Sequence, residues 1–174
     1  TGVSVYGIIC NTALVAICLC KGIEQAAQPI LSINHGAGLS SRILKVQSLS
    51  LKTSVIICTL PVLLGLFVPN LFTYIFLEPT SKILTLAAPA IRIYFTGFLF
   101  LGINMVFICY FQSVAKSVQS LSLCLLRGFF LGVVFVYFLP VFFESPGIWL
   151  AFPAAEFLTM IVGICFYRQD LKAY

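Results

Sequence analysis

The sequence predicts an all-α protein, a polytopic bundle of about five transmembrane helices. The first observation behind this prediction is composition: 61% of the 174 residues are hydrophobic and only 9% are charged, whereas a soluble domain carries about 25% charged residues. A soluble core of this length could not hide so much apolar surface, so the excess must face a lipid bilayer. The second observation is that the apolar residues gather in long stretches separated by short turn sequences.

Each apolar stretch exceeds the roughly 20 residues that a membrane-spanning helix needs. The first span is long and contains Lys21 and Glu24, so only part of it needs to lie in hydrocarbon. The second span contains Pro61 and Pro69, which kink a helix in a way that a membrane bundle tolerates. In chain order, the predicted spans cover about residues 3–35, 46–77, 83–114, 118–142 and 147–167.

The connections between these spans consist of turn-forming residues. They are GAGLSS, EPTS, AKS and ESPG in chain order. Because each connection is short, neighbouring helices must run antiparallel.

Basic residues gather at alternate ends of the predicted helices. Because basic loops stay on the cytoplasmic side, we expect a multi-pass protein of the cell membrane whose N-terminal end faces outside and whose C-terminus faces the cytoplasm. This pattern explains the net charge of +5, and no basic run is dense enough to indicate nucleic-acid binding. The basic residues of the first connection, the third connection and the tail are Arg42, Lys45, Lys116, Arg168 and Lys172.

Glu24 is the first candidate for binding a cation or proton inside the membrane, where a charged residue costs about 2.5–3.5 kcal/mol. Glu24 and Gln28 are four residues apart and share a helix face. Pro29 has no N–H, so the carbonyl of Gln25 is left without its helical donor. A carboxylate beside free carbonyl oxygens suits a cation or a proton. The alternative is that Glu24 only pairs with Lys21, three residues earlier.

The third span holds further polar and aromatic candidates. Asn104 lies at its middle, Tyr110 and Gln112 follow, and Phe98 is one of five nearby phenylalanines. One interpretation is the aromatic wall of a drug-sized cavity with a central amide, to which Gln28 and Asn34 of the first span would add polar groups. The other is ordinary helix packing, with Asn104 hydrogen-bonded to a neighbouring helix.

Glu156 is the second coupling candidate. It lies about nine residues past Gly147, hence roughly 14 Å into the fifth span at 1.5 Å per residue. A carboxylate at that depth must be protonated or pair with a cation such as Arg127. Arg127, in the fourth span, is expected to face protein or water. A coupling role and a structural network are both consistent with this position.

The residue pattern indicates neither an enzyme active site nor a metal site. The seven cysteines form no CxxC pair and mostly lie in apolar runs, where Cys acts as a small hydrophobe. No metal site is therefore expected. No Ser/His/Asp set or pair of carboxylates stands at a catalytic spacing, and the chain has one histidine, so we expect no catalytic residues.

Three segments together resemble one transporter family. They are GIEQAAQPILSINHGAG, IRIYFTGFLFLGINMVFICYFQSVAK and GIWLAFPAAE, in this order along the chain. Their order and spacing are similar to the last five helices of the twelve-helix multidrug and toxic compound extrusion (MATE) transporters. The resemblance implies that residues 1–174 form part of a C-terminal lobe. It also implies that the N-terminal lobe and one further helix are missing from this sequence.

The resemblance also implies a function. Such transporters export amphipathic, often cationic compounds by antiport against protons or sodium, through a central cavity that alternates between the two membrane faces. The expected partners are the bilayer, a small-molecule cargo and the missing lobe. The coupling ion, H⁺ or Na⁺, takes the place of a cofactor. Some members carry an acidic residue in the helix that matches the third span, where this chain has Asn104 as its only strongly polar mid-span group, so coupling would depend on Glu24, Glu156 or the missing lobe.

Two alternatives stay open. A relative with the same architecture flips lipid-linked oligosaccharides, and its phosphate-bearing cargo would require a cationic cavity, which Arg92 and Arg127 allow. The other alternative is a truncated chain that transports nothing.

Overall fold

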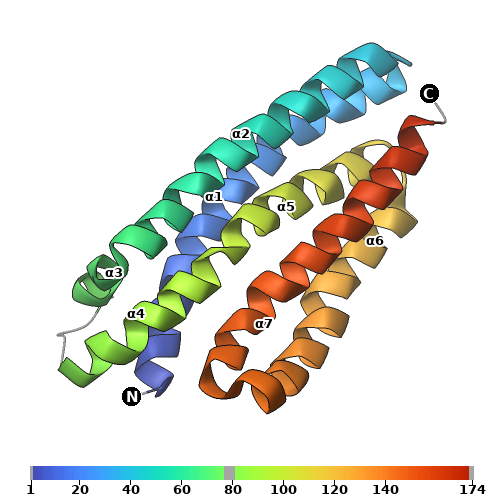
Figure 1. The fold of residues 1–174 in the computed structure, drawn as a ribbon. Coiled ribbons are helices and arrows are strands. Elements are labelled where there is room, and N and C mark those ends of the chain that lie inside the picture. The colour runs from blue at the N-terminus through green and yellow to red at the C-terminus, as the bar shows by residue number, and fades with distance from the viewer. Residues whose placement is uncertain (1, 77–80, 173–174) are drawn as a thin grey trace.

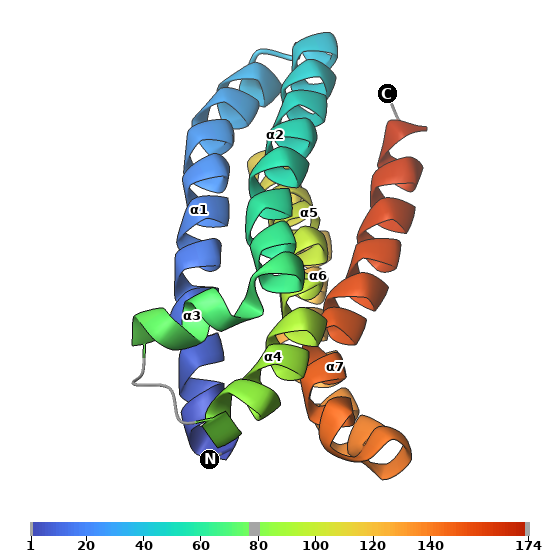
Figure 2. The same ribbon diagram turned by 60° about the vertical axis from the view of Figure 1, so that its left-hand side comes forward.

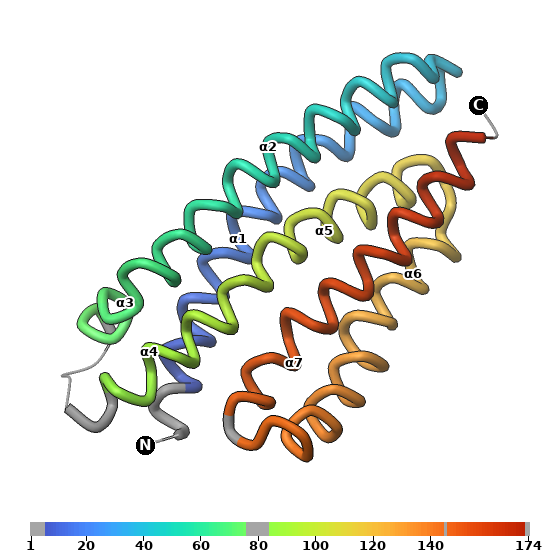
Figure 3. Tube along the Cα trace, viewed as in Figure 1, coloured from blue at the N-terminus to red at the C-terminus, as the bar shows by residue number. Residues whose placement is uncertain are grey.

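The computed structural model describes residues 2–76 and 81–172 (Figure 3). The elements are α1 (Gly2–Gly36), α2 (Ser40–Phe67), α3 (Pro69–Phe76), α4 (Ser81–Phe95), α5 (Gly97–Ser113), α6 (Ser117–Leu125), the π-helical turn η1 (Leu126–Phe130) and α7 (Leu131–Leu171). Five helical stretches within these residues are long and apolar enough to cross a membrane: Tyr6–Gly36, Ser40–Phe67, Leu84–Ser113, Ser117–Glu144 and Pro146–Leu171. The predicted all-α class with five spans is confirmed. The predicted EPTS connection falls almost entirely outside the described residues.

The second predicted span is divided in the structure. It ends at Phe67, and Val68 leaves the helical conformation with φ −132° and ψ 54°. A residue before proline is disfavoured in the α region, and proline fits the first position of a helix. Pro69 therefore begins the short helix α3, which lies across the neighbouring helices in Figure 2. Only Pro61 stands inside α2.

The predicted ESPG turn lies inside the element α7. Glu144 has φ 52° and ψ −133°, and the chain reverses there, so α7 comprises two antiparallel segments (Figures 1 and 3). At Gly147 an added Cβ would lie 2.5 Å from the carbonyl oxygen of Leu139. The tight reversal therefore requires glycine at this position.

Helix α5 lies at the centre of the bundle, with α1 and α2 on one side and α7 on the other (Figure 1). Most of its side chains are buried. A Cβ on Gly102 would lie 2.4 Å from Cys58 Sγ and 2.5 Å from Ser54 Oγ, so this glycine lets α2 approach α5 closely. In contrast, Val134 and Val141 on α7 are exposed and suit contact with lipid.

One end of the bundle gathers the basic residues. The α1–α2 turn, the α5–α6 turn and the C-terminal end of α7 all lie at this end (Figure 1). It therefore carries the basic residues of the two turns and the tail, and we call it the basic end. That the basic end faces the cytoplasm remains a prediction.

Candidate functional site

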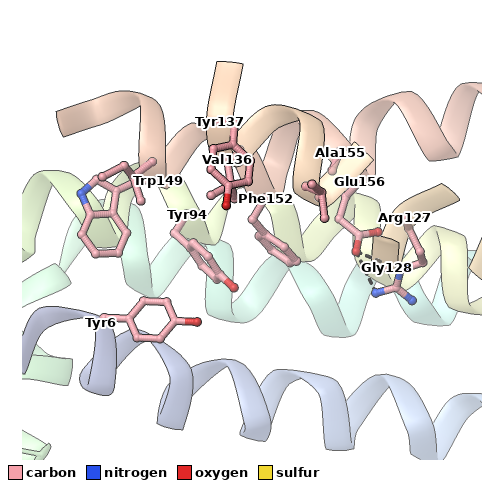
Figure 4. A pocket seen from close by; sticks show the side chains of 14 residues that line it. Tyr6, Tyr94, Arg127, Gly128, Val136, Tyr137, Trp149, Phe152, Ala155 and Glu156 are labelled. Atoms are coloured by element: carbon pink, nitrogen blue, oxygen red, sulfur yellow. Dashed lines mark hydrogen bonds and ion pairs between the residues drawn. The ribbon is translucent and has the colours of Figure 1, made fainter. Parts of the chain in front are cut away.

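A cavity of about 440 Å³ opens between α1, α4, η1 and both segments of α7 (Figure 4). Five aromatic side chains contribute to its lining: Tyr6, Tyr94, Tyr137, Trp149 and Phe152. The rings of Tyr94 and Phe152 are stacked, with centroids 4.4 Å apart and planes 12° apart. Flat aromatic walls suit planar apolar molecules, and their ring faces also attract cations.

An ion pair closes one end of this cavity (Figure 4). Arg127 donates to Glu156 Oε1 from both Nη2, at 2.7 Å, and Nε, at 3.0 Å. The two side chains are 19% and 4% exposed. The π-helical turn η1 carries Arg127, and single π-helical turns frequently mark functional sites. The contact expected between these two residues is present.

Asn104 completes the hydrogen bonding of the carboxylate. Its Nδ2 donates to Glu156 Oε2 at 2.7 Å and to the carbonyl oxygen of Glu156 at 2.8 Å. Both carboxylate oxygens therefore have donors, from α5 and from η1. The buried Oδ1 of Asn104 has no hydrogen-bond partner in the described part of the chain.

A second cavity of about 380 Å³ lies against the same ion pair. Both cavities are lined by Arg127, Gly128, Phe152 and Glu156, and the second one also by Cys124. The ion pair therefore borders both cavities. A carboxylate in this position can exchange its arginine for a proton or for a cationic ligand.

Glu24 lies outside both cavities. It is 8% exposed, and its Oε2 lies 2.9 Å from Lys21 Nζ, as the alternative interpretation predicted. Its carbonyl oxygen accepts a weak hydrogen bond from Cys109 Sγ at 3.5 Å. A role of Glu24 in binding a coupling ion stays a prediction.

Two of the predicted cavity residues are packed inside the protein. Phe98 is fully buried and packs edge-on against Tyr94 and Phe152, so it supports the cavity wall from behind. Tyr110 is also fully buried, and its hydroxyl donates to Asp170 Oδ2 at 2.7 Å. Neither side chain lines the cavity. Their helix α5 is buried on most sides, which directs these rings into the core.

The other three predicted cavity residues lie towards the basic end. Gln28 and Gln112 are exposed on α1 and α5. Asn34 donates from Nδ2 to the carbonyl oxygen of Ile30, 2.7 Å away in its own helix. None of the three lines the cavity, because their helix positions lie several turns from the ion pair. Of the six predicted cavity residues, Asn104 contacts the site through its hydrogen bond to Glu156, and Phe98 contacts it only through the rings that it supports.

Most of the aromatic lining was not predicted from the sequence, although the spacing of three residues pointed to it. Trp149, Phe152 and Glu156 follow a spacing of three and four residues, which places them on one helix face. A carboxylate that shares a face with two aromatic rings indicates a cavity wall. Tyr6 and Tyr137 carry no such signal, because other helices bring them to the site.

Comparisons with known proteins agree with this fold. The MatE family model matches residues 1–138. A search of curated proteins found no match. The outward-facing conformation of a multidrug resistance MATE family transporter of the MOP superfamily is similar with a TM-score of 0.88 and 20% identity, covering 99% of this chain and 39% of that chain. The structure of MATE in complex with MaL6 is similar with a TM-score of 0.82 and 19% identity, again covering 99% of this chain and 39% of that chain.

The inward-facing conformation of a multidrug resistance MATE family transporter is also similar, with a TM-score of 0.75 and 19% identity over 97% of this chain and 38% of that chain. The chain thus spans about two fifths of the length of these solved transporters. At such identities the likeness shows the fold, and the family model supplies the assignment. Because that model matches most of its length, the chain belongs to the MatE family of multidrug and toxic compound extrusion transporters.

Proposed function

We propose that this chain forms part of the C-terminal lobe of a secondary active exporter. The exporter would move amphipathic or cationic compounds out of the cell in exchange for H⁺ or Na⁺. The observation that carries the proposal is the Arg127–Glu156 ion pair, which lines a cavity with aromatic walls and borders a second hollow beside it. Transport would require the N-terminal lobe as partner, since the chain spans about two fifths of the solved transporters.

Glu156 would link ion movement to cargo movement. With Glu156 ionised, Arg127 neutralises it and the pair adds no net charge to the cavity. A proton on Glu156 would weaken the pair and free Arg127, which would make the cavity positive and less attractive to a cationic cargo. A cationic cargo and a proton would therefore compete for the same carboxylate, as antiport requires.

The charge of the cavity favours drug export over flipping of a lipid-linked oligosaccharide. Among the described residues that line it, the charged ones are Arg127 and Glu156, and their charges cancel. A phosphate-bearing cargo would need a cationic cavity. Arg92 does not contribute to the lining.

Efflux of a fluorescent cationic dye tests the proposal. The intact transporter that contains this chain would be expressed in cells that lack other exporters. We expect dye efflux that a protonophore or sodium removal abolishes, and that Glu156→Gln reduces at least tenfold. Glu144→Gln makes the same change at an exposed turn and should leave efflux unchanged. Equal efflux by the two variants would contradict the role of Glu156.

The same assay examines the other coupling candidate. If Glu24→Gln abolishes efflux while Glu156→Gln does not, the residue that couples ion movement to export is Glu24 on α1 rather than Glu156 in the ion pair. Absence of efflux by the wild-type transporter at normal surface expression would contradict the exporter proposal itself.

A further inference from the structure

A separate groove of about 590 Å³ runs between α2, α5 and the second segment of α7. It shares no lining residue with the cavities beside the ion pair. Its walls are apolar apart from one lysine, Lys52. The main wall residues are Val55 and Ile56 on α2, Ile103 and Phe107 on α5, and Met160 and Ile164 on α7.

Lys52 is an exposed cation beside this apolar groove. No acidic side chain pairs with it anywhere in the described part of the chain. It lies twelve residues after Ser40, hence roughly 18 Å along α2 from the basic end. Helical side chains lean towards the helix N-terminus, which for α2 is the basic end. A lysine at this depth needs an anion or water.

Two more cations lie on the same helix faces as residues that line the groove, one on α2 and one on α7. Lys45 lies seven residues before Lys52, so both occupy one face of α2. On α7, Arg168 follows Ile164 by four residues and continues the face that lines the groove. Lys45 and Arg168 are exposed, and no acidic partner for either is found among residues 2–76 and 81–172. The apolar walls of the groove are thus accompanied by basic groups on two helices.

We propose that this groove binds one anionic phospholipid. Its phosphate would lie between Lys52 and Arg168, and one acyl chain would lie along the apolar walls. Charge complementarity favours this occupant, because a neutral lipid would leave the basic groups without a counter-charge. In the described residues the backbones of α2 and α7 do not come close to each other, since the two helices lie on opposite sides of α5 (Figure 1). The lipid would therefore link two helices that the protein itself leaves apart.

Native mass spectrometry of the purified intact transporter tests the proposal. The probes are dioleoylphosphatidylglycerol and dioleoylphosphatidylcholine, added at equal concentration in mild detergent. We expect the wild-type protein to retain one phosphatidylglycerol molecule more tightly than phosphatidylcholine. Lys52→Gln should weaken that retention about fivefold, because one basic group near a lipid phosphate contributes roughly this factor. Arg42→Gln removes the same charge from α2 outside the groove and should preserve it.

A second pair of variants tests the apolar walls. Ile164→Trp should fill the groove and lower retention of phosphatidylglycerol, whereas Ile161→Trp, on an exposed part of α7 outside the groove, should not. Equal retention of the two lipids by the wild-type protein would overturn the proposal. So would a Lys52→Gln variant, folded by circular dichroism, that retains phosphatidylglycerol as the wild type does. These results do not depend on transport, so they are separate from the test of the exporter function.

Discussion

Breaking the Arg127–Glu156 ion pair should destabilise the folded protein. Glu156→Gln removes the carboxylate and leaves a guanidinium that is 19% exposed without its counter-charge. Removing one partner of a buried ion pair costs about 3–5 kcal/mol. Because Arg127 borders two cavities, water can partly solvate it. We therefore expect the lower end of that range, about 3 kcal/mol in the free energy of unfolding.

A double-mutant cycle measures the pair directly. The intact transporter would be unfolded by a titration with sodium dodecyl sulfate in mixed micelles and followed by far-ultraviolet circular dichroism. The variants are Glu156→Gln, Arg127→Gln and the double variant. We expect a coupling free energy of about 2 kcal/mol, within the range measured for interacting residues. The combination of Arg127→Met with Glu156→Leu should recover most of the lost stability, because it leaves no unpaired charge.

Additive effects of the two single variants would contradict the predicted coupling between Arg127 and Glu156. If the costs of the two single variants add to that of the double variant within about 0.5 kcal/mol, the residues act independently. The attraction between the two side chains would then contribute nothing to the free energy of unfolding.

Three further predictions concern the packing around α5. Gly102→Val should lower the free energy of unfolding by about 1–3 kcal/mol through overpacking, whereas Gly22→Ala, which meets no atom within 4 Å, should not lower it in the same titration. The thiols of Cys20 and Cys58 lie 3.1 Å apart, so diamide should join α1 to α2 in a disulfide that peptide mass spectrometry detects; two free thiols after treatment would contradict the contact. Asp170→Asn removes the carboxylate that accepts from Lys116 and Tyr110 and should cost about 1.5–3 kcal/mol; unfolding at the wild-type detergent concentration would contradict this.

The spans were predictable because hydropathy and length are local properties. The contact between Arg127 and Glu156 was also predictable, since a charge deep in hydrocarbon must find a counter-charge within reach. The contact of Glu24 with Lys21 was one of two interpretations of Glu24, because the two residues are three apart on one helix. These predictions needed only depth and sequence distance, which the chain itself supplies.

The direction of each aromatic side chain was not predictable. Tyr94 lines the cavity while Phe98, one turn later, is fully buried behind it. The helices are apolar on all sides, so periodicity does not show which face meets a neighbour. The hydrogen bond between Tyr110 and Asp170 likewise depends on the arrangement of α5 against α7. The break at Val68 was a local signal, the residue before a proline, that the prediction of one continuous span overlooked.

The fluorescence of Trp149 tests directly whether cargo binds in the aromatic cavity. It is the single tryptophan of this chain and lines the aromatic cavity. A cationic dye that binds there should quench it, so the purified intact transporter should show saturable quenching that is missing in Trp149→Phe. We expect Phe152→Ala, which keeps Trp149, to lose this part of the quenching as well. Identical quenching of the wild type and Trp149→Phe at every dye concentration would contradict the claim that cargo binds in this cavity.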